Sequence, residues 1–280
     1  MMIKKPIVPD EPTIPLLPNL FTAGNLLCGF FAILTILQGM IAGTQESGYH
    51  FQSAYGAYQQ ATYFIFASCL FDLLDGRVAR MSGQEGPFGR EFDSLADIVS
   101  FGLAPALLLS KAVLFNLPYS WMGWAIGALY LLCAGLRLAR FNCMASAPKK
   151  EGQTSDFIGL PVPMAAGAIV STMFLIIHMY RTEIDLGWLK YFLAFAMVGI
   201  SILMMSRVMY PSFKHININT KGTLVALVVI PFGAIALFYF PWVMPAVLFC
   251  IYLLYGLVRP WITKKWQAWL EAREIGEDDL

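Results

Sequence analysis

Four aspartates stand in an otherwise apolar part of the chain. Asp72 and Asp75 close one hydrophobic run, and Asp93 and Asp97 open the next. Ionised carboxylates in or beside hydrocarbon need partners, so acidic residues there indicate an ion site or a proton relay. On helices, spacings of three and four residues place each pair on one face of its own helix. Each helix therefore offers two carboxylates to one neighbour.

The connection between the two pairs, Met81 to Phe88, contains Gly83, Gly86 and Pro87. These residues favour a turn, which lets the two helices lie antiparallel with their acidic ends together. Four carboxylates then converge, and like charges this close stay ionised only when cations neutralise them. Hard divalent ions prefer oxygen ligands. The pattern predicts one or two ions of the Mg²⁺ or Mn²⁺ kind.

Small residues follow the first aspartate on the same helix face. Gly76 and Ala79 come four and seven residues after Asp72, so the backbone there is open to a bulky ligand or to close helix packing. Arg80, the next residue, offers a fork of donors to phosphate. A nucleotide diphosphate that is bridged through metal ions fits this arrangement.

The run from Asp72 to Asp97 matches the pattern D-x2-D-G-x2-A-R-x8-G-x3-D-x3-D without a gap, Gly89 included. This pattern resembles that of the CDP-alcohol phosphatidyltransferase family. The resemblance implies that Asp72, Asp75 and Asp93 hold metal, and that Asp97 lies near the metal and acts as general base. It also implies that Asp72, Gly76, Ala79, Arg80 and Gly89 bind CDP-diacylglycerol. The alternative is that the acids are ordinary loop charges and helix caps.

Three further stretches are similar to one branch of that family, the membrane-embedded phosphatidylserine synthases. They are Pro18 to Gly29, Arg137 to Asn142 and Phe157 to Pro163, followed by Ser206 and the run Tyr210 to Lys214. The resemblance implies that the phosphatidyl group of CDP-diacylglycerol passes to the hydroxyl of L-serine, giving phosphatidylserine and CMP by direct displacement. It also implies a homodimer.

Arginines in the second stretch suit the acceptor. Arg137 and Arg140, three apart on a helix, can clamp the serine carboxylate, and Asn142 can help to fix the zwitterion. The alternative is that the arginines only anchor the helix to lipid phosphates.

Polar residues in the first stretch suit the donor. We assign Asn19, Thr22 and Asn25 to the cytidine or the pyrophosphate. The alternative is that they are simple caps at a helix entry.

Composition indicates an integral membrane protein. Of the 280 residues, 58% are hydrophobic and 13% are charged, and the mean hydropathy is positive. We expect one membrane-embedded domain over residues 1–280, an all-α bundle of about eight transmembrane helices, with a possible interfacial tail at 261–280. The expected spans are 18–40, 57–80, 91–115, 119–143, 162–180, 188–207, 222–240 and 242–258.

Lysine and arginine placement orients this bundle. With the amino terminus inside, 16 of the 19 fall on the inner side, and only Lys111, Arg181 and Lys190 fall opposite. Both termini are then cytoplasmic, and the aspartates lie at the cytoplasmic face of the cell membrane. The expected partners are CDP-diacylglycerol, L-serine and membrane lipids, without nucleic acid.

Two alternatives remain open. The acceptor can be glycerol 3-phosphate, an inositol phosphate or choline, with the same chemistry. From a different class, a bundle with clustered acids can be a divalent-cation transporter, whose sites tend to lie near the midplane between broken helices. A covalent route is disfavoured, because none of His50, His178 and His215 begins a His-x-Lys motif.

Overall fold

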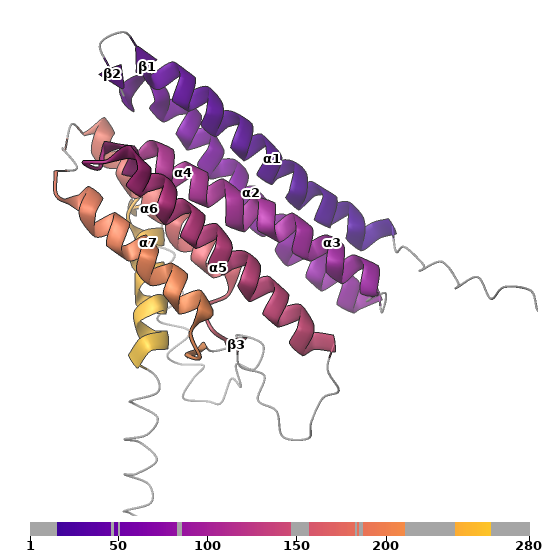
Figure 1. The fold of residues 1–280 in the computed structure, drawn as a ribbon. Helices are drawn as coiled ribbons and strands as arrows, with labels where there is room; N and C mark the ends of the chain where they lie inside the picture. The colour runs from indigo at the N-terminus through magenta and orange to yellow at the C-terminus, as the bar shows by residue number, and fades with distance from the viewer. Residues whose placement is uncertain are drawn as a thin grey trace, which may run out of the picture.

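The computed structural model describes residues 16–45, 48–49, 51–82, 86–146, 157–182, 184, 187–210 and 239–258. The helices are α1 (Leu16–Gly43), α2 (Phe51–Ser82), α3 (Pro87–Asp97), α4 (Ala104–Ala112), α5 (Ser120–Ser146), α6 (Val162–Arg181) and α7 (Leu189–Met205). A π-helix, Ile98–Leu103, joins α3 to α4, and a 3-10 turn, Leu114–Asn116, follows α4. A last helix, Met244–Val258, is drawn in yellow in Figure 1.

The described residues outside helices include two short antiparallel ladders. β1 (Thr44–Gln45) pairs with β2 (Gly48–Tyr49) in the connection between α1 and α2. β3 (Phe157–Ile158) pairs with β4 (Met209–Tyr210), so the segment before α6 meets the segment after α7. The expected helical bundle is confirmed.

Four helices are long and apolar enough to cross a membrane among the described residues: Leu16–Gly43, Pro87–Ala112, Trp121–Met144 and Val162–Arg181. Leu189–Met205 and Met244–Val258 are apolar but shorter. The α2 helix is long, yet it is not in this group, because Gln59, Gln60 and its aspartates interrupt the apolar sequence. The expected spans near these helices exist as helices, whereas 222–238 and the tail 261–280 lie outside the described residues.

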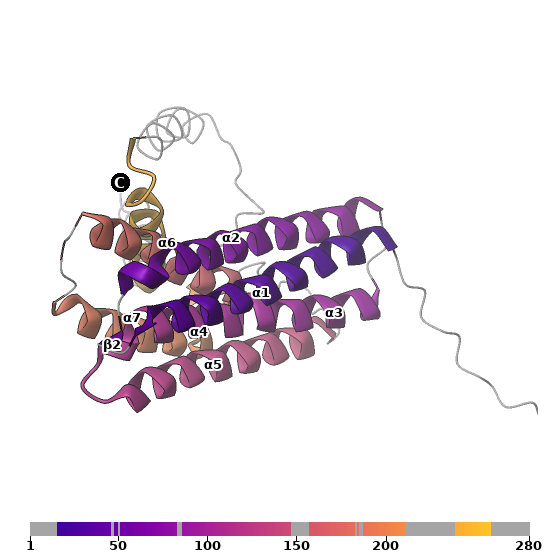
Figure 2. The same cartoon turned by 90° about the horizontal axis from the view of Figure 1, so that it is seen from above.

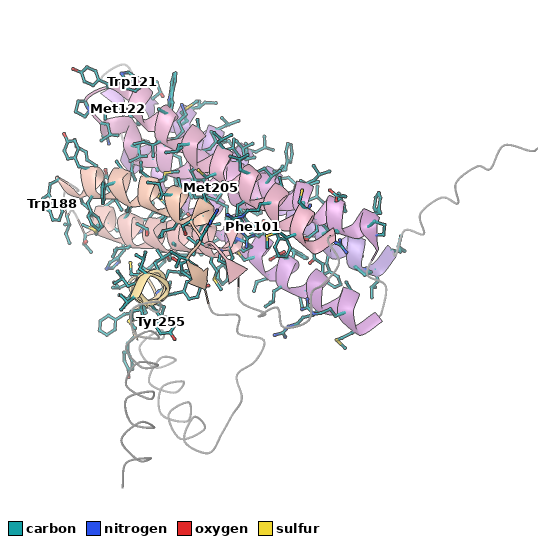
Figure 3. The ribbon with its side chains drawn as sticks, turned by 60° about the horizontal axis from the view of Figure 1, so that its bottom comes forward. Phe101, Trp121, Met122, Trp188, Met205 and Tyr255 are labelled. Atoms are coloured by element: carbon teal, nitrogen blue, oxygen red, sulfur yellow. The ribbon has the colours of Figure 1, made fainter. Side chains whose placement is uncertain are left out.

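The helices α1 to α7 run roughly along one another, whereas the last helix, Met244–Val258, crosses their direction and is seen end-on in Figure 3. Figures 1 and 2 both show α1 and α2 side by side, with α3, α4 and α5 beside them. Large aromatic side chains fill the interior, where Tyr58, Phe101 and Tyr130 are fully buried. Figure 3 shows Trp121 and Trp188 at one end of the bundle, and both side chains are more than half exposed. Exposed tryptophans at a helix end are typical of a membrane interface.

The other end of the bundle holds the starts of α1 and α3 and the ends of α2 and α5 (Figure 1). The helices α2 and α3 continue past the acidic residues: α2 ends at Ser82, seven residues after Asp75, and α3 begins at Pro87, six residues before Asp93. The acids therefore lie more than about one and a half turns inside the helices, not at their last residues. The physical reason lies in the sequence, where the residues that favour a turn, Gly83, Gly86 and Pro87, come only at 83–87.

Candidate functional site

Three aspartates from two helices meet at one point. Asp72 and Asp75 on α2 and Asp93 on α3 each offer a carboxylate oxygen, and these oxygens lie within 4.8 Å of one another. Asp75 is buried, and one oxygen of Asp93, Oδ1, is buried without a hydrogen-bond partner among the described residues. The convergence that the spacing predicts is confirmed for these three side chains.

Asp97 lies beside this group, one turn further along α3. It is 7% exposed, and its carboxylate is close enough to Asp72 and Asp93 for charge repulsion. A carboxylate in this position either joins in holding a cation or accepts a proton.

The α1 helix covers the acidic group with polar side chains. Thr22 Oγ1 donates to Asp75 Oδ2 at 2.9 Å, and Asn25 Nδ2 donates to Asp97 Oδ1 at 3.2 Å. Both α1 residues are buried. They are contacts across helices rather than caps, since Thr22 and Asn25 stand six and nine residues after the first residue of α1.

The backbone of Asn25 is also tied to its neighbours. Its carbonyl oxygen accepts hydrogen bonds from Ser68 Oγ on α2 at 3.2 Å and from Ser100 Oγ in the π-helix at 2.9 Å. The sequence pattern did not predict these two serine contacts. Their signal was weak, because a serine in an apolar helix most often bonds to its own backbone. Short π-helices within α-helices are frequent at functional sites, and this π-helix begins directly after Asp97.

The small residues leave room around the acids. A methyl group on Gly76 would meet only the side chain of Arg80, at 3.5 Å, and one on Gly89 would meet Asn19 Oδ1, also at 3.5 Å. Asn19 Nδ2 is buried without a partner among the described residues. Arg80 is exposed, and its charge interacts favourably with Asp75. Ala79 is half-buried one turn beyond Asp75.

Arg137 on α5 approaches the acidic group from a third helix. Its side chain is buried, and its guanidinium lies 5.4 Å from the ring centroid of Phe141. The guanidinium is also close enough to Asp97 for a charge interaction. A buried cation next to the site is suited to an anionic ligand group.

Arg140 and Asn142, expected beside Arg137, contact protein groups. Arg140 donates to the carbonyl oxygens of Met204 and Met205 at the end of α7, at 3.3 Å each. Asn142 Nδ2 donates to Ser94 Oγ on α3 at 2.9 Å. These contacts join the end of α5 to α7 and to the acidic helix α3.

Gly159 makes room for the Arg140 contact. Its φ of +79° lies in the left-handed region, and a methyl group there would stand 2.6 Å from Met204 O and 2.7 Å from Arg140 Nη2. Its amide donates to Val208 O at 2.8 Å. The stretches 137–142, 157–163 and 206–210 are therefore one local structure.

Tyr210 ends that structure. Its ring packs 5.4 Å from the ring of Tyr252 on the last helix, and its hydroxyl is buried without a partner among the described residues. Burial raises the pKa of Tyr210 to about 12, so the phenol stays neutral.

The donor set fits a divalent metal ion. Three carboxylate oxygens from two helices lie close together, and the partnerless Oδ1 of Asp93 is an acceptor that a cation satisfies. Asp72, Asp75 and Asp93 are the residues that would hold such an ion, with Asp97 adjacent.

The fold and the site together define a class: a helical membrane protein with a cluster of acidic residues set among interhelical hydrogen bonds. Residues 15–205 match the family model for CDP-alcohol phosphatidyltransferase. That match covers more than half of the 280 residues, and the chain belongs to this family. The resemblance seen in the sequence is confirmed.

Relatives agree with this assignment. A protein of Helicobacter pylori strain J99, named CDP-diacylglycerol--serine O-phosphatidyltransferase, is 35% identical over 250 residues, which cover 88% of this chain and 91% of that protein. A Bacillus subtilis protein of the same name is 31% identical, over 71% of this chain and 91% of its own length. The archaetidylserine synthase of Methanothermobacter thermautotrophicus is 32% identical over 73% of each chain.

Proposed function

We propose that this protein transfers the phosphatidyl group of CDP-diacylglycerol to the hydroxyl of L-serine and releases CMP. The observation that carries the proposal is the meeting of Asp72, Asp75 and Asp93, with Asp97 beside them, in a chain whose relatives are named for this reaction. The archaeal relative is named for archaetidylserine, so these names share serine and differ in the lipid.

The donor lies with its acyl chains in the bilayer and its pyrophosphate at the acidic group. Gly76 and Gly89 leave space for the headgroup between α2 and α3, and Arg80 supplies donors to the phosphate oxygens. Asn19, whose Nδ2 is buried without a partner among the described residues, and Thr22 line this side from α1. Ala79 and Asp72 complete it on α2.

The acceptor approaches from the side of Asp97. Asp97 takes the proton of the serine hydroxyl as the oxygen attacks the phosphorus that bears diacylglycerol. The bond from that phosphorus to the CMP oxygen breaks, and CMP leaves as a phosphate monoester. One displacement accounts for both products, without a covalent enzyme intermediate.

The metal supplies charge neutralisation for the phosphates when it is bound. Two ions of Mg²⁺ or Mn²⁺, held by Asp72, Asp75, Asp93 and Asp97, would balance the negative charge of the four carboxylates. The side chains of α1 keep the ligands in place, because Thr22 donates to Asp75 and Asn25 to Asp97.

Arg137 binds the serine carboxylate. Its guanidinium is buried and interacts electrostatically with Asp97, so one small molecule reaches Arg137 with its carboxylate and Asp97 with its hydroxyl. Arg140 and Asn142 support this end of α5 by their contacts to α7 and α3, and they complete the serine subsite. A bidentate guanidinium–carboxylate pair also discriminates against choline, which has no carboxylate.

The protein works as a homodimer in the cytoplasmic membrane, with both termini and the acidic end of the bundle at the cytoplasmic face. Arg77, Arg80 and Arg90 lie in the helix turns beyond the aspartates, as the positive-inside rule expects of a cytoplasmic end. Nucleotide substrates are present on that side.

Release of CMP tests the proposal. CMP release by purified protein in detergent is measured with CDP-diacylglycerol and Mn²⁺ or Mg²⁺. The rate with serine as the acceptor is compared with the rates with glycerol 3-phosphate, an inositol phosphate and choline. We expect release with serine and formation of phosphatidylserine by mass spectrometry. Release only with another acceptor would overturn the headgroup assignment, and no release with any acceptor would favour the cation transporter.

A further inference from the structure

We propose that Asn25 serves the acceptor alcohol: its Nδ2 holds the carboxylate of Asp97, and its Oδ1 accepts a hydrogen bond from the ammonium group of serine. The sequence assigned Asn25 to the nucleotide donor together with Asn19 and Thr22. This inference rests on the proposed function, because it takes Asp97 as the base and serine as the acceptor.

The orientation of the amide comes first. Asn25 Nδ2 lies 3.2 Å from Asp97 Oδ1, and an ionised carboxylate only accepts hydrogen bonds. The amide therefore turns its NH₂ group to Asp97, and its carbonyl oxygen faces away from that carboxylate oxygen. That Oδ1 is buried and has no hydrogen-bond partner among the described residues.

The side chain is held where it is. Asn25 is 0% exposed, and its backbone carbonyl accepts hydrogen bonds from Ser68 Oγ and Ser100 Oγ. Helix α1 is thus fixed at this residue against both α2 and the π-helix. Buried polar atoms in native proteins nearly always have a partner, so an acceptor fixed in this way calls for a donor from a ligand.

The position along α1 separates two tasks. Thr22 Oγ1 lies 2.9 Å from Asp75, a member of the three-carboxylate group, whereas Asn25 lies against Asp97, which is outside the 4.8 Å group. The spacing of three residues places Thr22 and Asn25 on one face of α1, one turn apart. Thr22 therefore serves the donor and metal side, and Asn25 serves the base.

The charges around Asp97 match an amino acid. Arg137 interacts with Asp97 from α5 and offers a cation for a carboxylate, while Asn25 Oδ1 offers an acceptor for an ammonium group. A hydroxyl between them reaches Asp97. Serine carries a carboxylate, an ammonium group and a hydroxyl on adjacent atoms, so its three groups correspond to three side chains from three helices.

The test separates the kinetic constants of the two substrates. Asn25→Leu keeps the size of the side chain and removes both polar atoms. We expect the KM for serine to rise roughly 10- to 100-fold, as for a lost hydrogen bond to a charged group, and kcat to fall by about 10-fold. The KM for CDP-diacylglycerol and its binding in the absence of serine are expected to stay within about 2-fold of wild type.

Thr35→Val is the matched control. Thr35 is also a buried polar residue of α1, and its hydroxyl bonds to the backbone oxygens of Phe31 and Ala32, away from the aspartates. Its kinetic constants are expected to equal those of wild type. A second variant, Asn25→Asp, keeps the shape and an acceptor oxygen but loses the donor to Asp97, so kcat falls while the KM for serine changes less than in Asn25→Leu.

Three results would overturn the inference alone. The first is an unchanged KM for serine in Asn25→Leu. The second is a raised KM for serine together with an unchanged kcat in Asn25→Asp. The third is a loss of CDP-diacylglycerol binding in Asn25→Leu as large as the loss for serine, which would return Asn25 to the donor side. A wild type that releases no CMP with serine would instead overturn the proposed function.

Discussion

At the scale of single residues, the site is recognisable by polar atoms that lack partners. Asn19 Nδ2, Asn25 Oδ1 and Asp93 Oδ1 are buried without a hydrogen bond among the described residues. Each unsatisfied buried polar group lowers the free energy of unfolding by about 1–3 kcal/mol. Three such groups near one carboxylate cluster therefore lower the stability of the protein without a ligand. Ligands that satisfy these atoms would recover that free energy, which supports the proposal that the cluster is a binding site.

Replacing the base separates catalysis from binding. Asp97→Asn keeps the shape of the side chain and removes its ability to accept a proton, so kcat is expected to fall by about 10²- to 10⁴-fold. Binding of CDP-diacylglycerol, measured directly without serine, is expected to persist because Asp72, Asp75 and Asp93 are intact. Asp93→Asn is the comparison, and there donor binding should weaken. Equal weakening in Asp97→Asn would make Asp97 chiefly a metal ligand.

The two arginines of α5 are expected to act on serine by different routes. Arg137→Lys removes the bidentate fork and should raise the KM for serine roughly 10-fold or more, with the KM for CDP-diacylglycerol unchanged. Arg140→Ala should also raise the KM for serine. It should in addition loosen the end of α7, because Met204 O and Met205 O lose their hydrogen-bond donor. Kinetics and thermal unfolding of both variants check this. A kinetic effect of either variant confined to the lipid donor would contradict the serine subsite.

At the scale of elements, the spacing of the aspartates was enough to predict that α2 and α3 bring Asp72, Asp75 and Asp93 together. That inference needed only helical periodicity and a turn near Gly83 and Pro87. The π-helix after Asp97 was not predicted, because nothing in the run Ile98–Leu103 distinguishes it from an ordinary helix. The contact of Arg140 with α7 was not predictable either, since it joins residues 64 and 65 positions apart.

Gly159 shows how strongly three distant stretches depend on each other. Gly159→Ala forces a side chain into the left-handed region, at a cost of roughly 1–2 kcal/mol, and drives it against Met204 O and Arg140. We expect the unfolding temperature to fall by about 2–4 °C per kcal/mol of stability lost. We also expect CMP release to respond more weakly to added serine.

Gly199→Ala in α7 is the control for this change. A methyl group on Gly199 meets no atom within 4 Å, and alanine is favoured over glycine in a helix by roughly 0.5–1 kcal/mol. Its unfolding temperature is expected to stay the same or to rise. A fall as large as that of Gly159→Ala would mean that an added methyl group lowers stability even without a clash, so the loss in Gly159→Ala would not be due to the Arg140 contact.

At the scale of the whole molecule, composition was sufficient to predict a helical membrane protein, but not the number of spans. Four helices meet the length and hydropathy of a span among the described residues, and α2 does not, although it packs along α1. The reason is physical: α2 carries buried polar and acidic residues, such as Ser68 and Asp75, that contact neighbouring helices. These residues lower the mean hydropathy of α2 although the helix packs within the bundle. A count based on hydropathy alone therefore leaves out helices, such as α2, that carry the polar residues of the candidate site.

Topology is testable at this scale with one native side chain. Cys143 is exposed near the end of α5, at the aspartate end of the bundle (Figure 1). With Cys28, Cys69, Cys133 and Cys250 replaced by alanine, Cys143 is expected to react with a membrane-impermeant maleimide only after cells are permeabilised. Tyr119→Cys, with Cys143 also replaced, places a thiol at the exposed residue before α5, at the opposite end, and is expected to react in intact cells. The contrast follows because α5 is long enough to span the membrane between these two positions. Labelling of Cys143 in intact cells would place the aspartates on the outer face, away from the nucleotide donor, and would contradict the proposed orientation.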